Sequence, residues 1–186
     1  TFHAFTDIFG GTDLVTGISE IHLTELSDDV VGTSGQEVVY THEGDDYIET
    51  HGGSDFIHAG DGQDTIIFYG DEEIFGGSGS DIFVLSSNHQ DSFDTIINDF
   101  SFDDGDVLDL RSIPTLSRDD INTTVIDEST LELSIGNLGK ITLNNIDFVS
   151  DENIQSKIKD QILVTENVTS LEMINHASDI IDPLTG

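Results

Sequence analysis

The chain has 186 residues, of which 38 are Asp or Glu and five are Lys or Arg, so its formal net charge is −33. All five basic residues lie after residue 110. This balance excludes nucleic acid and anionic membrane surfaces as partners, because both are bound through basic patches. The absence of cysteine excludes disulfides and thiolate metal sites.

The N-terminal part of the chain gives few signals. No apolar run approaches the length of a membrane span, and no N-terminal secretory signal is visible. The chain opens with TFHAFTDIF and no Met, so we expect it to be a segment of a longer protein. A Gly-Gly-x-Asp turn and the alternating stretch ISEIHLTEL follow. We interpret residues 1–31 as an N-terminal cap or as the end of a preceding domain.

A nine-residue repeat occupies residues 32–84. Its units are GTSGQEVVY, THEGDDYIE, THGGSDFIH, AGDGQDTII, the eight-residue FYGDEEIF and GGSGSDIFV. One gap before the glycine of FYGDEEIF restores the register, and the fourth place is then Gly in every unit. The sixth place is always acidic, with Glu37, Asp46, Asp55, Asp64, Glu72 and Asp81. The eighth place is always large and apolar, with Val39, Ile48, Ile57, Ile66, Ile74 and Phe83. An acidic disordered or halophilic segment would share the composition but not this period.

The repeat resembles the calcium-binding nonapeptide G-G-x-G-x-D-x-U-x of RTX (repeats-in-toxin) proteins. The second-place Gly is often replaced, and a weaker preceding unit has Asp28 and Val30 in the acidic and apolar places. The resemblance implies an all-β fold, a right-handed parallel β-roll in which two units form one coil. Each unit is then a six-residue turn followed by a short strand whose eighth-place residue points inward.

Stacked coils bring acidic residues eighteen apart to about the strand spacing of 4.8 Å. Two such charges repel by roughly 3 kcal/mol at an effective dielectric of 20. Hard carboxylates and turn carbonyls are the donors that Ca²⁺ takes, six to eight per ion. We therefore expect several Ca²⁺ ions to be part of the fold, with binding and folding as one equilibrium.

The two sides of the roll differ in their acids. Aspartates occupy one side, which we call the aspartate side (Asp28, Asp46, Asp64 and Asp81). The other, the glutamate side, has Glu37, Asp55 and Glu72. We predict the better-formed sites on the aspartate side, the strongest between AGDGQD and GGSGSD, and a distorted or missing site at the shortened FYGDEEIF. With the turn positions added, the predicted calcium ligands are Asp28, Glu37, His42, Gly44, Asp46, Asp55, Gly60, Gly62, Asp64, Glu72, Gly77, Gly79, Asp81, Asp94 and Asp99.

Two other kinds of site are weaker alternatives. His42, His51 and His58 are close in sequence and suggest zinc, but two occupy turn places and one an outward place, which favours exposed side chains. Paired carboxylates occur in glycosidases, but here they recur with the repeat period, which metal ligation explains better.

The segment 91–113 does not follow the nine-residue repeat and resembles the segment that closes RTX blocks. There Asp94 and Asp99 either complete a last calcium site or cap turns. Alternating stretches at 121–127, 130–136 and 140–149 predict antiparallel strands. Their apolar side is predicted to be Val125, Leu131, Leu133, Ile135, Ile141, Leu143 and Ile146.

Residues 150–163 are predicted to form a helix, capped by Ser150 and with Ile154, Ile158 and Ile162 along one face. These signals give four regions, which are a cap at 1–31, the roll at 32–90, a closing region at 91–165, and a tail or export signal at 166–186.

The C-terminal region resembles that of type I secreted RTX adhesins. This resemblance implies a non-enzymatic, calcium-loaded, monomeric module that meets the type I secretion machinery during export and works outside the cell or at its surface. The alternative is the RTX module of a secreted protease, lipase or alginate epimerase, whose catalysis would lie elsewhere because the chain has no HExxH or GxSxG motif. A glycan-binding roll is a third possibility.

Overall fold

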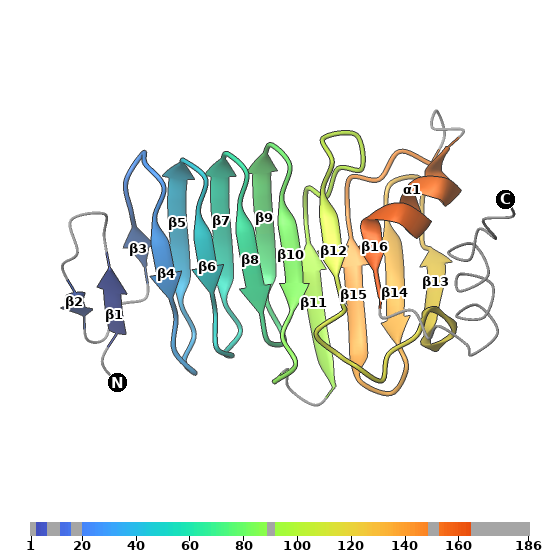
Figure 1. The fold of residues 1–186 in the computed structure, drawn as a ribbon, viewed down its shortest axis with the longest axis horizontal. Coiled ribbons are helices and arrows are strands. Elements are labelled where there is room, and N and C mark those ends of the chain that lie inside the picture. The colour runs from blue at the N-terminus through green and yellow to red at the C-terminus, as the bar shows by residue number, and fades with distance from the viewer. Residues whose placement is uncertain (1–2, 7–11, 16–19, 89–91, 149–152, 165–186) are drawn as a thin grey trace, which may run out of the picture.

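The computed structural model describes residues 3–6, 12–15, 20–88, 92–148 and 153–164. They form two eight-stranded sheets that face each other along the roll (Figure 1). Sheet A contains, in spatial order, β2 (Thr12–Val15), β1 (His3–Thr6), β4 (Asp29–Val31), β6 (Tyr47–Glu49), β8 (Thr65–Phe68), β10 (Ile82–Leu85), β12 (Val107–Asp109) and β16 (Ile162–Leu163). Sheet B contains β3 (Ile21–His22), β5 (Val38–Glu43), β7 (Phe56–Asp61), β9 (Glu73–Ser78), β11 (Phe93–Ile97), β15 (Gly139–Leu143), β14 (Leu131–Ile135) and β13 (Ile121–Val125).

The chain alternates between the two sheets, and each repeat unit supplies one strand. Successive strands within a sheet are parallel, with Val39 opposite Ile57 in sheet B and Ile48 opposite Ile66 in sheet A. This is the predicted parallel β-roll, and the register is the predicted eighteen residues. The weak unit that contains Asp28 and Val30 also contributes a strand to the roll, because Val30 lies opposite Ile48.

The shortened unit FYGDEEIF does not disturb the strands. Ile57 lies opposite Ile74, and Ile66 lies opposite Phe83, each seventeen residues away. The missing residue is therefore taken up in the turn, as predicted from the position of the gap.

The core is a single layer of apolar side chains between the sheets. All six eighth-place residues are at most 2 % exposed, which confirms their predicted inward direction. The first place of several units also points inward, where it is occupied by Thr41, Thr50, Ala59 and Phe68. This second inward position was not predicted, because its residue types vary too much to form a pattern.

Both ends of the roll carry further strands. At the N-terminal end, β1 and β2 form an antiparallel hairpin, and Thr6 of β1 lies opposite Asp29. At the other end the sheets continue past residue 90, because β11 extends sheet B and β12 extends sheet A. The sequence change at residue 91 therefore lengthens the turns without interrupting the sheets.

The predicted antiparallel strands are present as β13, β14 and β15. The apolar residues of β14 and β15, together with Ile146, are buried as expected. The prediction for Val125 is wrong, because its side chain is 53 % exposed. It lies on β13, the outermost strand of sheet B, where burial by neighbours is least.

The predicted helix is shorter than expected. Helix α1 (Ile154–Gln161) begins after Asn153, and Ile162 leaves the helix to pair with Leu108 as part of β16. A short 3-10 helix, η1, spans Arg118–Asp120. The predicted cap Ser150 and the tail at 166–186 lie outside the described residues. Within the described ranges, no helix has the length and apolar character that a membrane crossing requires.

Candidate metal centre

The acidic residues of the sixth place are buried inside the turns. All seven, from Asp28 to Asp81, are at most 4 % exposed. Their backbone is held by the following coil. The carbonyl of Asp46, for example, accepts the backbone N–H of Thr65 at 2.8 Å, and its N–H donates to the next carboxylate.

Hydrogen bonds link the carboxylates of the aspartate side into one continuous row. The backbone N–H of Asp28 donates to Oδ1 of Asp46, and that of Asp46 donates to Oδ1 of Asp64, both at 2.8 Å. The row continues from the N–H of Asp64 to Oδ1 of Asp81 at 3.0 Å. It then reaches Asp106, whose Oδ1 accepts the N–H of Asp81 at 3.0 Å.

Three aspartates of this row, and Asp55 of the glutamate side, keep a second oxygen without any hydrogen bond. Among the described residues, the buried side-chain oxygens without a partner are the Oδ2 atoms of Asp46, Asp55, Asp64 and Asp81. A buried carboxylate oxygen without a partner is costly, and such atoms in folded proteins indicate a missing ion, proton or water. The four Oδ2 atoms therefore mark where an additional group belongs.

Turn glycines place main-chain carbonyls beside the same row. A Cβ on Gly62 would lie 1.8 Å from the carbonyl oxygen of Gly44, and one on Gly79 would lie 1.7 Å from that of Gly62. The second places of stacked units approach one another in the same way. A Cβ on Gly60 would lie 1.7 Å from the carbonyl oxygen of His42, and one on Gly77 would lie 1.8 Å from that of Gly60. Only glycine permits these approaches, so the predicted turn positions His42, Gly44, Gly60, Gly62, Gly77 and Gly79 do lie against one another.

The donor set is made of hard oxygens. In the described part of the chain, no three His, Cys, Asp or Glu side chains converge on one point. A cation in the turns must therefore combine few carboxylates with main-chain carbonyls, as Ca²⁺ does. The partnerless Oδ2 atoms and stacked carbonyls fit calcium.

Without a cation, the buried carboxylates hold protons unusually well. Burial is the main cause that raises the pKa of Asp55 to about 8, of Asp64 to about 7 and of Asp81 to about 6. Repulsion from carboxylates of neighbouring coils acts in the same direction, while the donated backbone N–H opposes it. Burial also raises the pKa of Asp46 and takes that of Asp106 to about 7.

The glutamate side is built differently. Glu72 folds back onto its own turn, where its carboxylate accepts the N–H groups of Tyr69 and Gly70 and the hydroxyl of Thr50 at 2.7–3.1 Å. Glu37 does the same with the N–H and hydroxyl of Thr33, at 3.1 and 2.6 Å. These carboxylates are occupied by their own turns.

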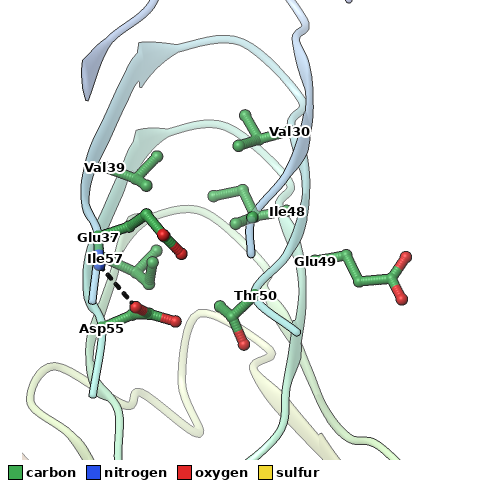
Figure 2. Close-up of a pocket in the computed structure, with 9 residues that line it drawn as sticks. Val30, Glu37, Val39, Ile48, Glu49, Thr50, Asp55 and Ile57 are labelled. Carbon is green, nitrogen blue, oxygen red and sulfur yellow. Dashed lines mark hydrogen bonds between the residues drawn. The ribbon is translucent and has the colours of Figure 1, made fainter. Parts of the chain in front are cut away.

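A cavity of about 10 Å³ lies between Glu37, Thr50 and Asp55. Figure 2 shows both carboxylates and the Thr50 hydroxyl on this cavity, while Glu49 points away from it. It has room for a single water-sized sphere. Asp55 is therefore the one residue of the glutamate side that has both a partnerless oxygen and adjoining space.

Three further predicted ligands, besides Glu37 and Glu72, have no partnerless oxygen. Asp28 accepts the N–H and hydroxyl of Thr24, at 3.0 and 2.9 Å, and so closes the first turn. Asp99 accepts the N–H groups of Gly76 and Gly77, both at 2.9 Å, which is the turn-capping alternative. Asp94 is exposed and forms an ion pair with Lys140 at 3.3 Å. Thr95, its neighbour, takes the buried place next to Glu72 and donates to the carbonyl of Gly70.

Asp106 is the member of the row that the repeat pattern missed. Its Oδ2 accepts the N–H of Ser101 at 2.8 Å, so this carboxylate closes the longer turn before β12. A signal for it exists, because it stands two places before the buried Leu108 as every sixth-place acid stands before its eighth-place residue.

The three histidines weighed as a zinc site, His42, His51 and His58, do not contact one another. His51 forms an ion pair with Glu49 at 3.3 Å, and His58 stacks on Phe75 with ring centroids 5.7 Å apart. His42 instead contacts His22, which lies on β3, the neighbour of β5 in sheet B.

A comparison with protein families agrees with this repeat. The family model described as RTX calcium-binding nonapeptide repeat (4 copies) matches residues 31–66 and 68–85. Among solved structures, the AlgE6R3 subunit of the Azotobacter vinelandii mannuronan C5-epimerase is similar at 20% identity and a TM-score of 0.35, over 78% of this chain and 83% of that one. No curated protein matches the chain. Residues 31–85, which build the stacked turns, thus belong to the RTX calcium-binding nonapeptide repeat family.

Proposed function

We propose that this chain is a non-catalytic module whose roll folds when Ca²⁺ binds between stacked turns. The observation that carries this proposal is the set of four buried Oδ2 atoms without a partner. They belong to turns whose main-chain carbonyls closely approach the next coil, in a chain with net charge −33. Calcium supplies the positive charge that the first 110 residues lack and makes binding part of the folding free energy.

The ligands we assign follow the partnerless oxygens. Asp46, Asp64 and Asp81 supply carboxylates on the aspartate side, with the carbonyls of the turn positions around them. Asp55 supplies one on the glutamate side. Glu37, Glu72 and Asp28 close their own turns, and we infer that they contribute less to ion binding.

The setting we propose is a large secreted adhesin that is exported through a type I secretion system. Calcium modules that work outside the cell bind with dissociation constants of about 10⁻⁴–10⁻³ M, far above cytosolic calcium. The chain then stays unfolded inside, and folds in millimolar calcium outside, which opposes backsliding through the export channel. A catalytic motif in the same gene would favour the secreted-enzyme alternative, whereas tandem sandwich repeats would favour the adhesin.

A calcium titration followed by far-UV circular dichroism tests the coupling. In excess chelator at pH 8, the β signal of the roll is expected to be absent, and it is expected to appear cooperatively with calcium. Magnesium at the same concentration is the control, because it demands a smaller octahedral site and gives up its waters reluctantly. A chain that is fully folded in chelator at pH 8 would refute the proposal.

A pair of substitutions separates the two sides. Asp64→Asn removes a carboxylate from the middle of the aspartate row and is expected to weaken calcium binding by at least about tenfold, the equivalent of about 1.4 kcal/mol. Glu72→Gln, the control, changes a carboxylate that its own turn occupies and is expected to leave the affinity unchanged. Isothermal titration calorimetry measures both, and equal losses in the two variants would contradict the assignment.

A further inference from the structure

Two imidazoles meet on the outward face of sheet B near its N-terminal end. His22 of β3 lies opposite Tyr40 of β5, and His42 stands two residues beyond Tyr40 on the same strand. Side chains two residues apart point to the same face of a strand. His22 and His42 are therefore diagonal neighbours on that face.

The distances between the two rings match a shared metal ion. Nδ1 of His22 lies 3.3 Å from Nε2 of His42. Two nitrogens that are each about 2.0–2.1 Å from a tetrahedral Zn²⁺ are about 3.3–3.4 Å apart. The ring centroids are 5.4 Å apart and the planes differ by 21°, so the rings lie side by side rather than face to face. In the absence of metal the same distance allows an N–H···N hydrogen bond between the two rings.

The ring of His22 is also held in the way that metal-bound histidines are held. Its Nε2 donates to Oε1 of Glu20 at 2.9 Å, which leaves the lone pair of the neutral ring on Nδ1, toward His42. Tyr40 stacks on the same ring with centroids 4.5 Å apart and planes within 5°. The His22 side chain is 52 % exposed, so water has access to the remaining coordination positions.

We propose that His22 and His42 form a two-imidazole site for a borderline divalent metal, Zn²⁺ being the probe, with water completing the shell and Glu20 positioning His22. The metal would join β3, a strand of two residues, to β5 and so fasten the N-terminal end of the roll. This site is separate from the turn sites, because imidazole nitrogen suits zinc and calcium takes oxygen.

Calorimetric titration of zinc into the calcium-saturated chain tests the proposal, since excess calcium occupies the carboxylates. We expect one zinc per chain that His22→Gln and His42→Asn each weaken by at least about tenfold. Glu20→Gln is expected to cost about tenfold, the lower end for residues that orient a metal ligand. Asn is chosen at position 42 because His42 has a φ of 77°, which Asn tolerates.

His58→Gln is the matched control, because His58 lies on the same face with its ring tilted against that of Tyr40, centroids 5.9 Å apart, but has no nitrogen contact to the pair. It should leave zinc binding unchanged. NMR of the histidine Cε1–Hε1 signals provides a second readout, in which zinc should shift His22 and His42 first. Absence of zinc binding, or equal loss in the His58 variant, would overturn the proposal, and unchanged calcium-dependent folding of the His22 and His58 variants shows that these two are intact.

Discussion

Acidification is expected to fold the calcium-free chain, which we expect to be unfolded at pH 8 in chelator. Asp55, Asp64, Asp81 and Asp106 have a raised pKa of about 8, 7, 6 and 7 in the fold, against 3.8 for an ordinary Asp. The folded state therefore binds more protons than the unfolded state between these values. The stability that these groups contribute is fully present below about pH 3.8 and is lost as the pH rises through 6 to 8.

The size of this effect is a few kcal/mol for each group, because each unit of pKa difference corresponds to about 1.4 kcal/mol. That is a large part of the stability of a small domain, about 5–15 kcal/mol. Protons and calcium compete for the same oxygens, so calcium affinity is expected to fall over the same range of pH. In saturating calcium the roll should thus be most stable near neutral pH, the reverse of its behaviour in chelator.

Thermal unfolding at pH 5, 6, 7 and 8, with and without calcium, measures both trends. Asp64→Asn mimics a permanently protonated side chain and should make the chelator-treated chain less sensitive to pH. Asp119→Asn removes an exposed carboxylate outside the repeats and controls for the loss of one negative charge. A chain in chelator that shows no thermal unfolding transition even at pH 5, or one whose midpoint is the same at pH 5 and pH 8, would contradict the account.

The repeat pattern predicted the features that depend on the period. The parallel roll, the inward eighth place and the seventeen-residue step at the short unit all follow from the spacing of Gly, acid and apolar residue, and the structure confirms them. The two inward threonines, Thr41 and Thr50, were not predictable, because the same place holds Ala59 and Phe68 in later coils.

The repeat pattern could not predict contacts between turns of different length. The turn between β11 and β12 is longer than the others, so Asp106 joins the aspartate row outside the nine-residue register. Asp94 has the acidic character of the row, but Thr95 takes the buried place because it stands two residues before Ile97, which lies opposite Ile74. The difference between Asp55 and Glu72 also needs coordinates, since both are buried acids and only hydrogen bonds distinguish them.

Replacing Gly79 by Ala is expected to lower the free energy of unfolding in saturating calcium by more than about 3 kcal/mol. Two causes act together. Gly79 has a φ of +132°, which residues with a Cβ rarely adopt, and its Cβ would lie 1.7 Å from the carbonyl oxygen of Gly62. That oxygen belongs to the main chain, so relief requires the two coils to separate. Separation would also disturb the neighbouring Asp64 and Asp81, and calcium affinity should fall with stability.

Gly35→Ala is the matched control, because Gly35 occupies the same fourth place of the repeat. Its backbone has no positive φ, and an added Cβ would meet nothing nearer than 3.5 Å. At such a site Ala is neutral or stabilises by up to about 1 kcal/mol, since it restricts the unfolded chain. The repeat pattern treats these two glycines as equivalent, whereas the structure assigns the requirement to the close approach of stacked coils. Chemical denaturation of both variants in calcium decides between these views, and equal losses at Gly35 and Gly79 would show that the glycine is needed for the turn itself and not for the stacking.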